Sequence, residues 1–423
     1  MVQLFMMADD LTGALDTGVH FQMAGLPVKV IVDREYSFPS DETASVVIVD
    51  TETRHLPAHA AYRIVYLLTR RACEAGIPYI YKKTDSALRG NPGSELAAVL
   101  DASGEMFLPF FPSYPRMRRI TRGGVQFIGD VPLAKSGYAS DPRNPMHTSY
   151  VPDILRQQCE LQVEAFNYVR LQEEGIGRKK GVLVFDAENT EEMEANVRLM
   201  QQENVLHLMG GCAGLAEILP ELLFSCERDR TQKKIPNRTG MTVVCGSMNP
   251  VSKAQLDYAQ NHGFGRLHLP GKALLDPCFW DLEEGGELLD EILLQRNRYR
   301  CHIIDTMADT GMEGMWKLAQ NGGLKQDEVP GRIVRSLSEL ARRLAMLPSD
   351  KALMIIGGDT LQGFLNQIGV TQITPIYEVE MATVLFETML DGRQEMMLTK
   401  SGGFGDETLL PRLAERVLQE ENT

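Results

Sequence analysis

Apolar and polar positions follow two different rhythms along the first half of the chain. Short apolar runs bounded by turn residues predict buried strands at 2–7, 27–33, 45–50 and 78–81. Apolar residues at helical spacing lie between these runs, over 13–24, over 59–74 and from Pro92 onward. Strands that alternate with helices in this way predict an α/β fold, with a parallel sheet covered on both faces. In such sheets ligands bind beyond the carboxyl ends of the strands.

The second half of the chain repeats this order of elements. Its strands are "MTVVC", "ALMII" and "EMMLTK", and each is followed by a turn with glycine and then by a helix. Between the halves, the polar stretch "CERDRTQKKIPNRTG" has the composition of a linker. We therefore expect two domains, 1–228 and 241–423, joined by a linker at 229–240. Each is expected to hold a mostly parallel sheet with helices on both faces, and the active site is expected in the cleft between them. Residues 112–150, rich in proline, glycine, arginine and serine, are predicted to form a long loop or lid.

Composition narrows the class of protein. A chain of 423 residues is too long for one ordinary core, which agrees with two domains. The net charge of −14 argues against a general binder of nucleic acid or of anionic membranes. The seven cysteines form no CxxC pair, so they are expected to be reduced, structural thiols. With neither a signal peptide nor an apolar run of membrane-spanning length, the chain is expected to be soluble and cytoplasmic.

The stretch "KKTDSALRGN", directly after the strand "IPYIY", carries the densest group of charged side chains. Lys82, Lys83 and Arg89 can bind an anion, and arginine suits a carboxylate in a bidentate manner. Asp85 and Ser86 can bind hydroxyl groups. A loop that binds both kinds of group fits a small acid that also carries hydroxyls.

Two adjacent aspartates follow the first strand, in "ADDLTGA". Asp9, Asp10 or Thr12 could simply cap the next helix by accepting from its free N–H groups. Two aspartates at a crevice loop also fit a binding or catalytic role. Arg54 follows the third strand, and a lone arginine of this kind is more often a solvated surface charge.

Three turns of the second half offer backbone N–H groups near helix starts: "CGSMNP", "GGDT" and "KSGGFG". One such turn alone is more often a tight connection, but three glycines in four positions leave a backbone that a ligand can approach closely. "GRLHLPGKA" is not a Walker A loop, because Arg266 replaces its first glycine and Ala273 its Ser or Thr. If this half binds ATP, it does so through a different glycine loop.

These groups favour a small polyhydroxy acid in the first half and the phosphates of a nucleotide in the second. A hydroxyl that faces a γ-phosphate across a cleft is the arrangement of a kinase, in which positioning, Mg²⁺ and charge neutralisation supply most of the catalysis. Taken together, the motifs resemble the four-carbon acid sugar kinase family from the first strand to the last helix. The five motifs, in chain order, are "MADDLTGALDTG", "KKTDSALRGN", "CGSMNP", "GGDT" and "KSGGFG".

The resemblance implies an acid-sugar domain followed by an ATP domain, and phosphorylation of the terminal hydroxyl of an acid such as D-threonate or D-erythronate. The substrate contacts that it implies are Asp10, Arg54, Lys83, Thr84, Asp85, Ser86 and Arg89. The ATP contacts that it implies are Ser247, Gly358, Asp359, Gly402, Gly403, Phe404 and Gly405. Asp10 is the candidate base and Asp359 the candidate ligand of Mg²⁺. The expected partners are the acid sugar and ATP, with no nucleic acid and no membrane, and a homodimer is left open.

Three other functions stay open at this point. A 3-oxo-tetronate kinase of the same family is one, although its members tend to carry Glu and Asn in the corresponding loops. A sensor or carrier that binds a sugar acid without chemistry is another, but it leaves the glycine loops unexplained. A ligase that forms an acyl phosphate would need a third substrate. Assaying ATP consumption with a panel of four-carbon acids distinguishes these functions.

Overall fold

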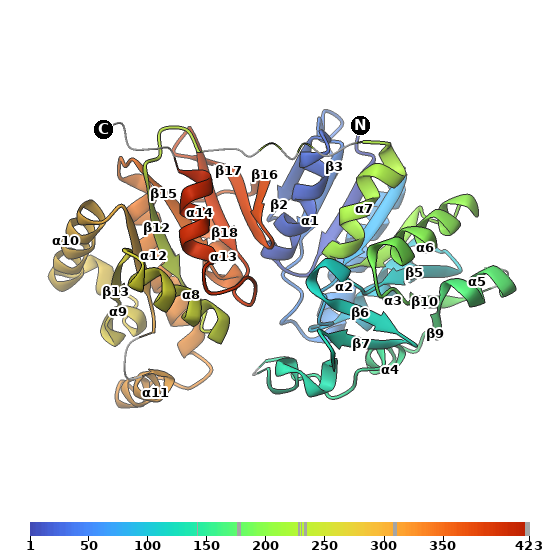
Figure 1. The fold of residues 1–423 in the computed structure, drawn as a ribbon, viewed down its shortest axis with the longest axis horizontal. Coiled ribbons are helices and arrows are strands. Elements are labelled where there is room, and N and C mark those ends of the chain that lie inside the picture. The colour runs from blue at the N-terminus through green and yellow to red at the C-terminus, as the bar shows by residue number, and fades with distance from the viewer. Residues whose placement is uncertain are drawn as a thin grey trace. The chain divides into compact units, whose positions relative to one another are not determined.

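The computed structural model describes residues 1–141, 143–175, 179–226, 229, 231, 235–307 and 311–418. The chain forms two compact units, Met1–Asp229 and Arg230–Thr423, each with its own sheet and helices (Figure 1). The linker predicted at 229–240 lies partly outside the described residues. Among the helices of the described ranges, none combines the length and the apolar character needed to cross a membrane.

The first unit is built on eight parallel strands in the order β2-β3-β1-β4-β11-β5-β10-β9. Its strands are β1 (Leu4–Ala8), β2 (Val28–Ile31), β3 (Val46–Asp50), β4 (Tyr79–Lys83), β5 (Phe107–Phe111), β9 (Val163–Phe166), β10 (Gly181–Phe185) and β11 (Leu208–Gly211). Its helices are α1 (Leu11–Met23), α2 (Ala58–Glu74), α3 (Pro92–Ser103), α4 (Val151–Arg156), α5 (Tyr168–Glu174), α6 (Thr190–Gln202) and α7 (Ala213–Phe224).

The helices of this unit lie in two groups, one on each face of its sheet. Helix α1 packs against α7, whereas α2 packs against α3, and Figure 1 shows these helices flanking the strands. Strands β1 and β3 are buried along their whole length, as expected for central parallel strands with few polar residues. The α/β architecture predicted for this half is confirmed.

The register of the central strands brings three strand ends to one place. Ala8, the last residue of β1, pairs with Asp50 at the end of β3 and with Lys83 at the end of β4. The loops that begin with Asp9, Thr51 and Thr84 therefore start side by side at the carboxyl edge of the sheet.

Residues 112–150, predicted to be a long loop, contain a small sheet. Strands β6 (Arg119–Arg122), β7 (Val125–Ile128) and β8 (Val131–Pro132) pair in antiparallel order. Gly123 and Gly124 form the two-residue turn between β6 and β7, with φ of 57° and 74°. Two successive positive φ values define a hairpin turn that glycine adopts without strain. The prediction of a loop was wrong over these strands, because a polar, glycine-rich composition is common to loops and to exposed hairpins, and the alternative of a lid stays a prediction.

The second unit has five parallel strands continued by an antiparallel hairpin, in the order β13-β14-β12-β15-β18-β17-β16. Its strands are β12 (Gly240–Cys245), β13 (Gly265–His268), β14 (Cys301–Asp305), β15 (Lys351–Ile356), β16 (Gln372–Glu380), β17 (Thr383–Leu390) and β18 (Arg393–Lys400). Its helices are α8 (Pro250–Asn261), α9 (Gly271–Leu275), α10 (Glu283–Arg298), α11 (Gly311–Asn321), α12 (Val329–Met346), α13 (Gly358–Gln367) and α14 (Leu409–Val417). The mostly parallel sheet predicted for this half is confirmed.

Candidate active site

Arg54 is the centre of a cluster of carboxylates at the strand ends of the first unit. Its Nε lies 2.8 Å from Asp9 Oδ2, its Nη1 2.6 Å from Asp10 Oδ2, and its Nη2 3.9 Å from Asp85 Oδ1. The Arg54 side chain is only 11% exposed, so it is no solvated surface charge. Burial by itself lowers the pKa of Arg54, but Asp10, Asp9 and Asp85 outweigh it and raise this pKa well above its usual range.

Asp10 has two structural bonds besides its ion pair. It is the N-cap of α1, where its Oδ1 accepts from Gly13 N at 3.0 Å, and its Oδ2 accepts from the Thr12 hydroxyl at 2.9 Å. The Asp10 side chain is nevertheless 25% exposed, unlike that of Asp9, which is 2% exposed. Capping and a role in binding are therefore compatible for Asp10, since one face of its carboxylate reaches solvent.

Lys82 is a core residue, although the sequence placed it in a binding loop. Strand β4 continues through Lys82 and Lys83, which pair with Met7 and Ala8 of β1. The Lys82 ammonium lies 3.1 Å from Glu95 Oε2 on α3 and donates to Lys83 O at 2.7 Å and Met7 O at 3.3 Å. All three of its donors are thus satisfied inside the protein.

Lys83, in contrast, keeps donors available. Its Nζ lies 4.0 Å from Asp9 Oδ1, and within the described part of the chain it makes no hydrogen bond. Asp9 Oδ1 is itself buried without a hydrogen-bond partner among the described residues. A Cβ at Gly13 would lie 2.6 Å from Lys83 Nζ, so glycine at this position keeps the space around the ammonium open. An ammonium and a carboxylate oxygen with unused bonding capacity suit a polar ligand.

The electrostatics keep Asp9 ionised. Burial acts to raise the pKa of Asp9, but Arg54, Lys83 and Lys82 together outweigh burial and lower it. Asp50, at the end of β3, behaves differently, because burial raises its pKa well above the usual range and the neighbouring Asp10, Glu52 and Asp9 add to this. Two carboxyl groups at neighbouring strand ends therefore have pKa values shifted in opposite directions.

Asp85 and Arg89 bind each other within the motif "KKTDSALRGN". Arg89 Nε lies 2.7 Å from Asp85 Oδ2 and Arg89 Nη2 lies 3.1 Å from Asp85 Oδ1, a bidentate pair. Arg89 also reaches Asp141 Oδ2 at 3.4 Å. Burial acts to raise the pKa of Asp85, but Arg89 and Arg54 hold it well below the usual range.

The hairpin region contributes two residues that the sequence did not single out. Arg119, on β6, donates to the Ser86 hydroxyl and, at 2.9 Å, to the hydroxyl of Tyr138. The Tyr138 ring also lies under the Arg89 guanidinium, 5.2 Å from its centroid. Thr84 bonds to Gly211 O through both its amide and its hydroxyl, at 2.7 and 3.2 Å. The structure thus gathers Arg54, Lys83, Asp85, Ser86 and Arg89 around one edge, while Thr84 is held against β11.

In the second unit, three loops meet at the carboxyl ends of β12, β15 and β18. Cys245 pairs with Ile356, and Ile356 with Lys400, so the strand ends are in register. The Ser252 hydroxyl of α8 donates to Gly402 O at 2.7 Å and lies 2.9 Å from the Ser247 hydroxyl, from which it can accept. Ser247 and the glycine loop, distant in the sequence, are therefore in contact.

The glycine loop is fixed from both sides. Gln255 Nε2 donates to Phe404 O at 2.9 Å, and Lys400 Nζ donates to Ser401 O at 2.9 Å and to Gly402 O at 3.0 Å. Burial lowers the pKa of Lys400 to about 8. Gly405 has φ of 85°, which only glycine adopts easily.

The turn after β15 completes this edge. Gly358 is the first residue of α13, and Asp359 is exposed in its first turn. The N-termini of α8 and α13 both adjoin the glycine loop region, since Ser252 bonds to Gly402 and Gly357 N to Lys400 O. The start of α13 and the glycine loop offer backbone N–H groups suited to phosphate, whereas at the start of α8 Pro250 has no N–H and Val251 N donates to Asn249 Oδ1.

Comparison with known proteins agrees with a sugar-binding first half and a nucleotide-binding second half. A model of sugar-binding N-terminal domains matches residues 4–219, and a model of nucleotide-binding C-terminal domains matches residues 242–410. A D-threonate kinase of Salmonella typhimurium is 31% identical over 421 residues, which cover 97% of each chain. The chain belongs to the four-carbon acid sugar kinase family. The resemblance stated from the five motifs is confirmed.

Other four-carbon acid sugar kinases match along almost the whole chain. A D-erythronate kinase of Heliobacterium modesticaldum is 24% identical, covering 96% of this chain and 95% of its own. A solved structure from Salmonella typhimurium has a TM-score of 0.77 at 22% identity, covering 99% of this chain and all of that one, and shows the same fold. Members of the family are phosphotransferases that act on a hydroxyl group, which confirms the predicted class of enzyme.

Proposed function

We propose that the protein transfers the γ-phosphate of ATP to the terminal hydroxyl of a four-carbon acid sugar such as D-threonate or D-erythronate. The observation that carries this proposal is the 31% identity to a D-threonate kinase over 97% of both chains. The cluster around Arg54 and the three glycine-containing loops supply the chemistry that such a reaction needs.

Residues 1–228 would bind the acid sugar. Lys83 and Arg89 are the cations near the exposed edge that suit its carboxylate, and Asp85 and Ser86 can contact its hydroxyls. Asp10 is the carboxylate of the Arg54 cluster with solvent access, at 25% exposure, so it is our candidate for the base that orients the attacking hydroxyl. Arg54 holds that carboxylate in place through a 2.6 Å ion pair.

Residues 241–423 would bind ATP. Backbone N–H groups near Ser247, Gly358 and the loop Gly402–Gly405 would bind phosphate oxygens, and Lys400 supports that loop through its bonds to Ser401 O and Gly402 O. Asp359 offers an exposed carboxylate at the start of α13, which fits a Mg²⁺ ion that is otherwise bound by water and phosphate. Bound Mg²⁺ would neutralise charge on the phosphates. Use of ATP supports a cytoplasmic location.

Release of ADP with a panel of four-carbon acids tests the proposal. We expect turnover with D-threonate or D-erythronate and a stable sugar phosphate as the sole second product. Turnover confined to a 3-oxo-tetronate would instead assign the activity of the 25% identical 3-oxo-tetronate kinase of Salmonella typhimurium. Acid binding without release of ADP would make the protein a sensor, and dependence on a third substrate would make it a ligase.

Removing Arg89 should impair use of the acid. In Arg89→Ala we expect KM for the acid to rise about 10- to 100-fold, because charge-assisted hydrogen bonds contribute about 1.5–3 kcal/mol. KM for ATP should stay unchanged in the same initial-rate assays. The matched control is Arg118→Ala, which removes a surface arginine, 71% exposed, that pairs with Asp130 at 2.7 Å. Normal KM and kcat in Arg89→Ala would show that Arg89 only holds Asp85.

A side chain at Gly402 should obstruct the nucleotide. A Cβ there would collide with Ser247 Oγ, so Gly402→Val must displace the serine loop. Overpacking of this kind costs about 1–3 kcal/mol, and we expect the Kd of ATP to weaken at least about tenfold by calorimetry. Gly286→Val on α10 is the control, because nothing lies within 4 Å of a Cβ at that position. An unchanged Kd in folded Gly402→Val would remove the glycine loop from the ATP site.

A further inference from the structure

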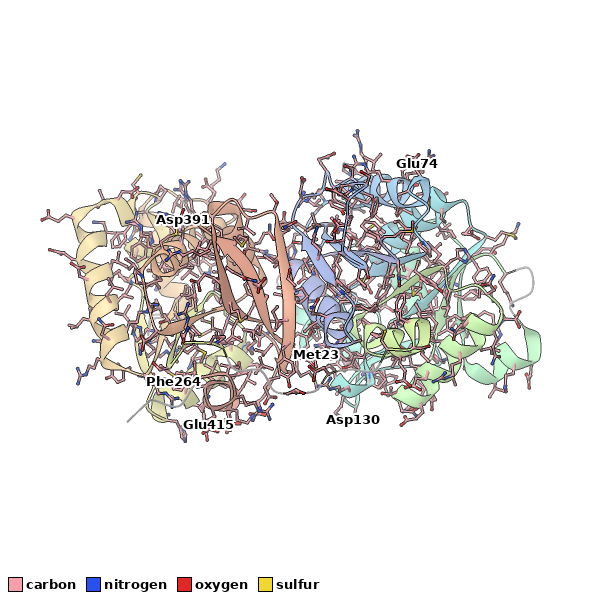
Figure 2. The ribbon with its side chains drawn as sticks, turned by 90° about the horizontal axis from the view of Figure 1, so that it is seen from above. Met23, Glu74, Asp130, Phe264, Asp391 and Glu415 are labelled. Atoms are coloured by element: carbon pink, nitrogen blue, oxygen red, sulfur yellow. The ribbon has the colours of Figure 1, made fainter. Side chains whose placement is uncertain are left out.

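A cavity of about 250 Å³ lies in the second unit, away from the glycine loops. It is found at the amino ends of the parallel strands, whereas the loops follow their carboxyl ends. Lys351 and Arg393 are the first residues of β15 and β18, and Arg238 precedes β12 by two residues. Asp391, labelled in Figure 2, marks the turn between β17 and β18 beside this cavity. The lining residues are therefore distinct from those assigned to ATP.

Arg296, on α10, is the most unusual residue of the lining. It is only 4% exposed, and its Nε is buried with no hydrogen-bond partner. Its guanidinium forms no ion pair or hydrogen bond with any residue in the described ranges. Burial lowers the pKa of Arg296, with Arg238 adding to this and Asp350 opposing it. A buried guanidinium nitrogen without a partner is unfavourable, and an anion bound in the cavity would offset this cost.

The other charged side chains of the cavity also favour an anion. Arg238, Lys351 and Arg393 also line it, and Glu395 is the one carboxylate among the lining residues. Glu395 is already paired with Arg238 at 2.7 Å, and Lys351 donates to Arg300 O at 3.3 Å. The lining residues thus carry four cations and one carboxylate, an excess of positive charge that Asp350, close to Arg296 and Lys351, reduces but does not cancel. Burial, together with Arg296 and Lys351, lowers the pKa of the neighbouring His302 to about 4, so this imidazole is neutral.

We propose that this cavity binds a small phosphate monoester, as a second anion site outside the catalytic loops. A dianion balances the excess charge better than a single carboxylate, and its oxygens can accept from two guanidinium groups at once. Apolar side chains line the remainder and suit a short organic group: Leu344, Leu347, Leu353, Leu390, Met396 and Met397. The volume is below the roughly 300–1,000 Å³ of pockets for drug-sized ligands, so the occupant is small.

The test measures binding of glycerol phosphate, inorganic phosphate and malonate by calorimetry at constant ionic strength, with ATP sites filled by a non-hydrolysable analogue and Mg²⁺. We expect glycerol phosphate to bind the wild-type protein, Arg296→Met to abolish this binding, and Arg393→Ala to weaken it at least about tenfold. Arg298→Met is the matched control, since Arg298 is an exposed arginine of the same helix that does not line the cavity.

Each outcome bears on the proposal. Equal affinity for inorganic phosphate would assign the cavity to the free ion, and tighter binding of malonate would overturn the phosphate class. Binding that survives in both Arg296→Met and Arg393→Ala would place the probe elsewhere and overturn the site. Because Arg393 is exposed, its replacement by alanine should leave the fold intact, and Arg393→Ala gives a reading even if Arg296→Met does not fold. Neither variant touches the catalytic residues, so kinase activity reports separately on the proposed function.

Discussion

Replacement of Asp10 by asparagine is expected to lower kcat by about 10²–10⁴-fold while the protein stays folded and binds ATP. Asparagine is as good an N-cap as aspartate, so its side-chain oxygen can still accept from Gly13 N and preserve the start of α1. What it removes is the negative charge that, in the proposed reaction, orients the attacking hydroxyl. Steady-state kinetics with saturating acid and ATP measure the loss, and thermal unfolding checks the fold.

Asp359→Asn is the comparison for this experiment. Asp359 lies at the start of α13 in the nucleotide-binding unit, so its loss should shift the Mg²⁺ or ATP dependence rather than the rate at saturation. If Asp10→Asn turned over normally while Asp359→Asn lost kcat with ATP affinity intact, Asp359 rather than Asp10 would be the base.

Replacement of Lys82 by methionine is expected to destabilise the first unit by about 3–5 kcal/mol at neutral pH, because it leaves the Glu95 carboxylate buried and unpaired. The two side chains are 0% and 1% exposed and 3.1 Å apart, and the Glu95 carboxylate also accepts from the Thr53 hydroxyl. Denaturant unfolding of the single and double variants measures the effect. The double variant Lys82→Met/Glu95→Gln should recover part of the stability, because it carries no buried charge at this position.

The pH dependence of the unfolding free energy of Lys82→Met distinguishes an unpaired Glu95 carboxylate from a simple packing defect. Burial raises the pKa of Glu95 already in the wild-type protein, in opposition to Lys82, and removing the ammonium should raise this pKa further. With a folded pKa above the unfolded value of about 4.3, the folded state binds the proton more tightly. The free energy of unfolding of Lys82→Met should therefore fall as pH rises above about 4.3 and level off beyond the folded pKa. A loss of stability that is constant with pH would contradict this origin.

The alternation of strands and helices was predictable because it depends on local patterns. The strand at 4–8 is apolar throughout, those at 46–50 and 240–245 are apolar except for Asp50 and Thr242, and Pro92 begins α3 as expected. The hairpin of β6 and β7 was not predictable in this way. Its strands are four residues each and carry arginines and glutamine, so their period-2 pattern is too short and too polar to distinguish from a loop.

The candidate site was predictable in its motifs but not in the roles of single side chains. Lys82 and Lys83 are adjacent residues of the same type. The buried Lys82 is paired with Glu95, whereas the Lys83 ammonium has N–H groups available for a ligand. Arg54 looked like a surface charge because its three carboxylate partners lie far from it along the chain. Arg119 and Tyr138 carry no motif at all. Such roles depend on contacts between distant segments, which local spacing does not reveal.

The two-residue turn at Gly123–Gly124 has a consequence for how substrate range can diverge. The hairpin that it closes lies outside the eight-stranded sheet, yet through Arg119 it contacts Ser86 in the main binding motif. Insertions or exchanges in this segment would leave the pairing of the parallel strands unchanged while altering the surroundings of Ser86, a proposed contact of the acid. The hairpin can therefore vary between relatives while the parallel sheet stays the same. A chimaera that carries the hairpin of a relative is expected to change the preference among acids and to keep the fold.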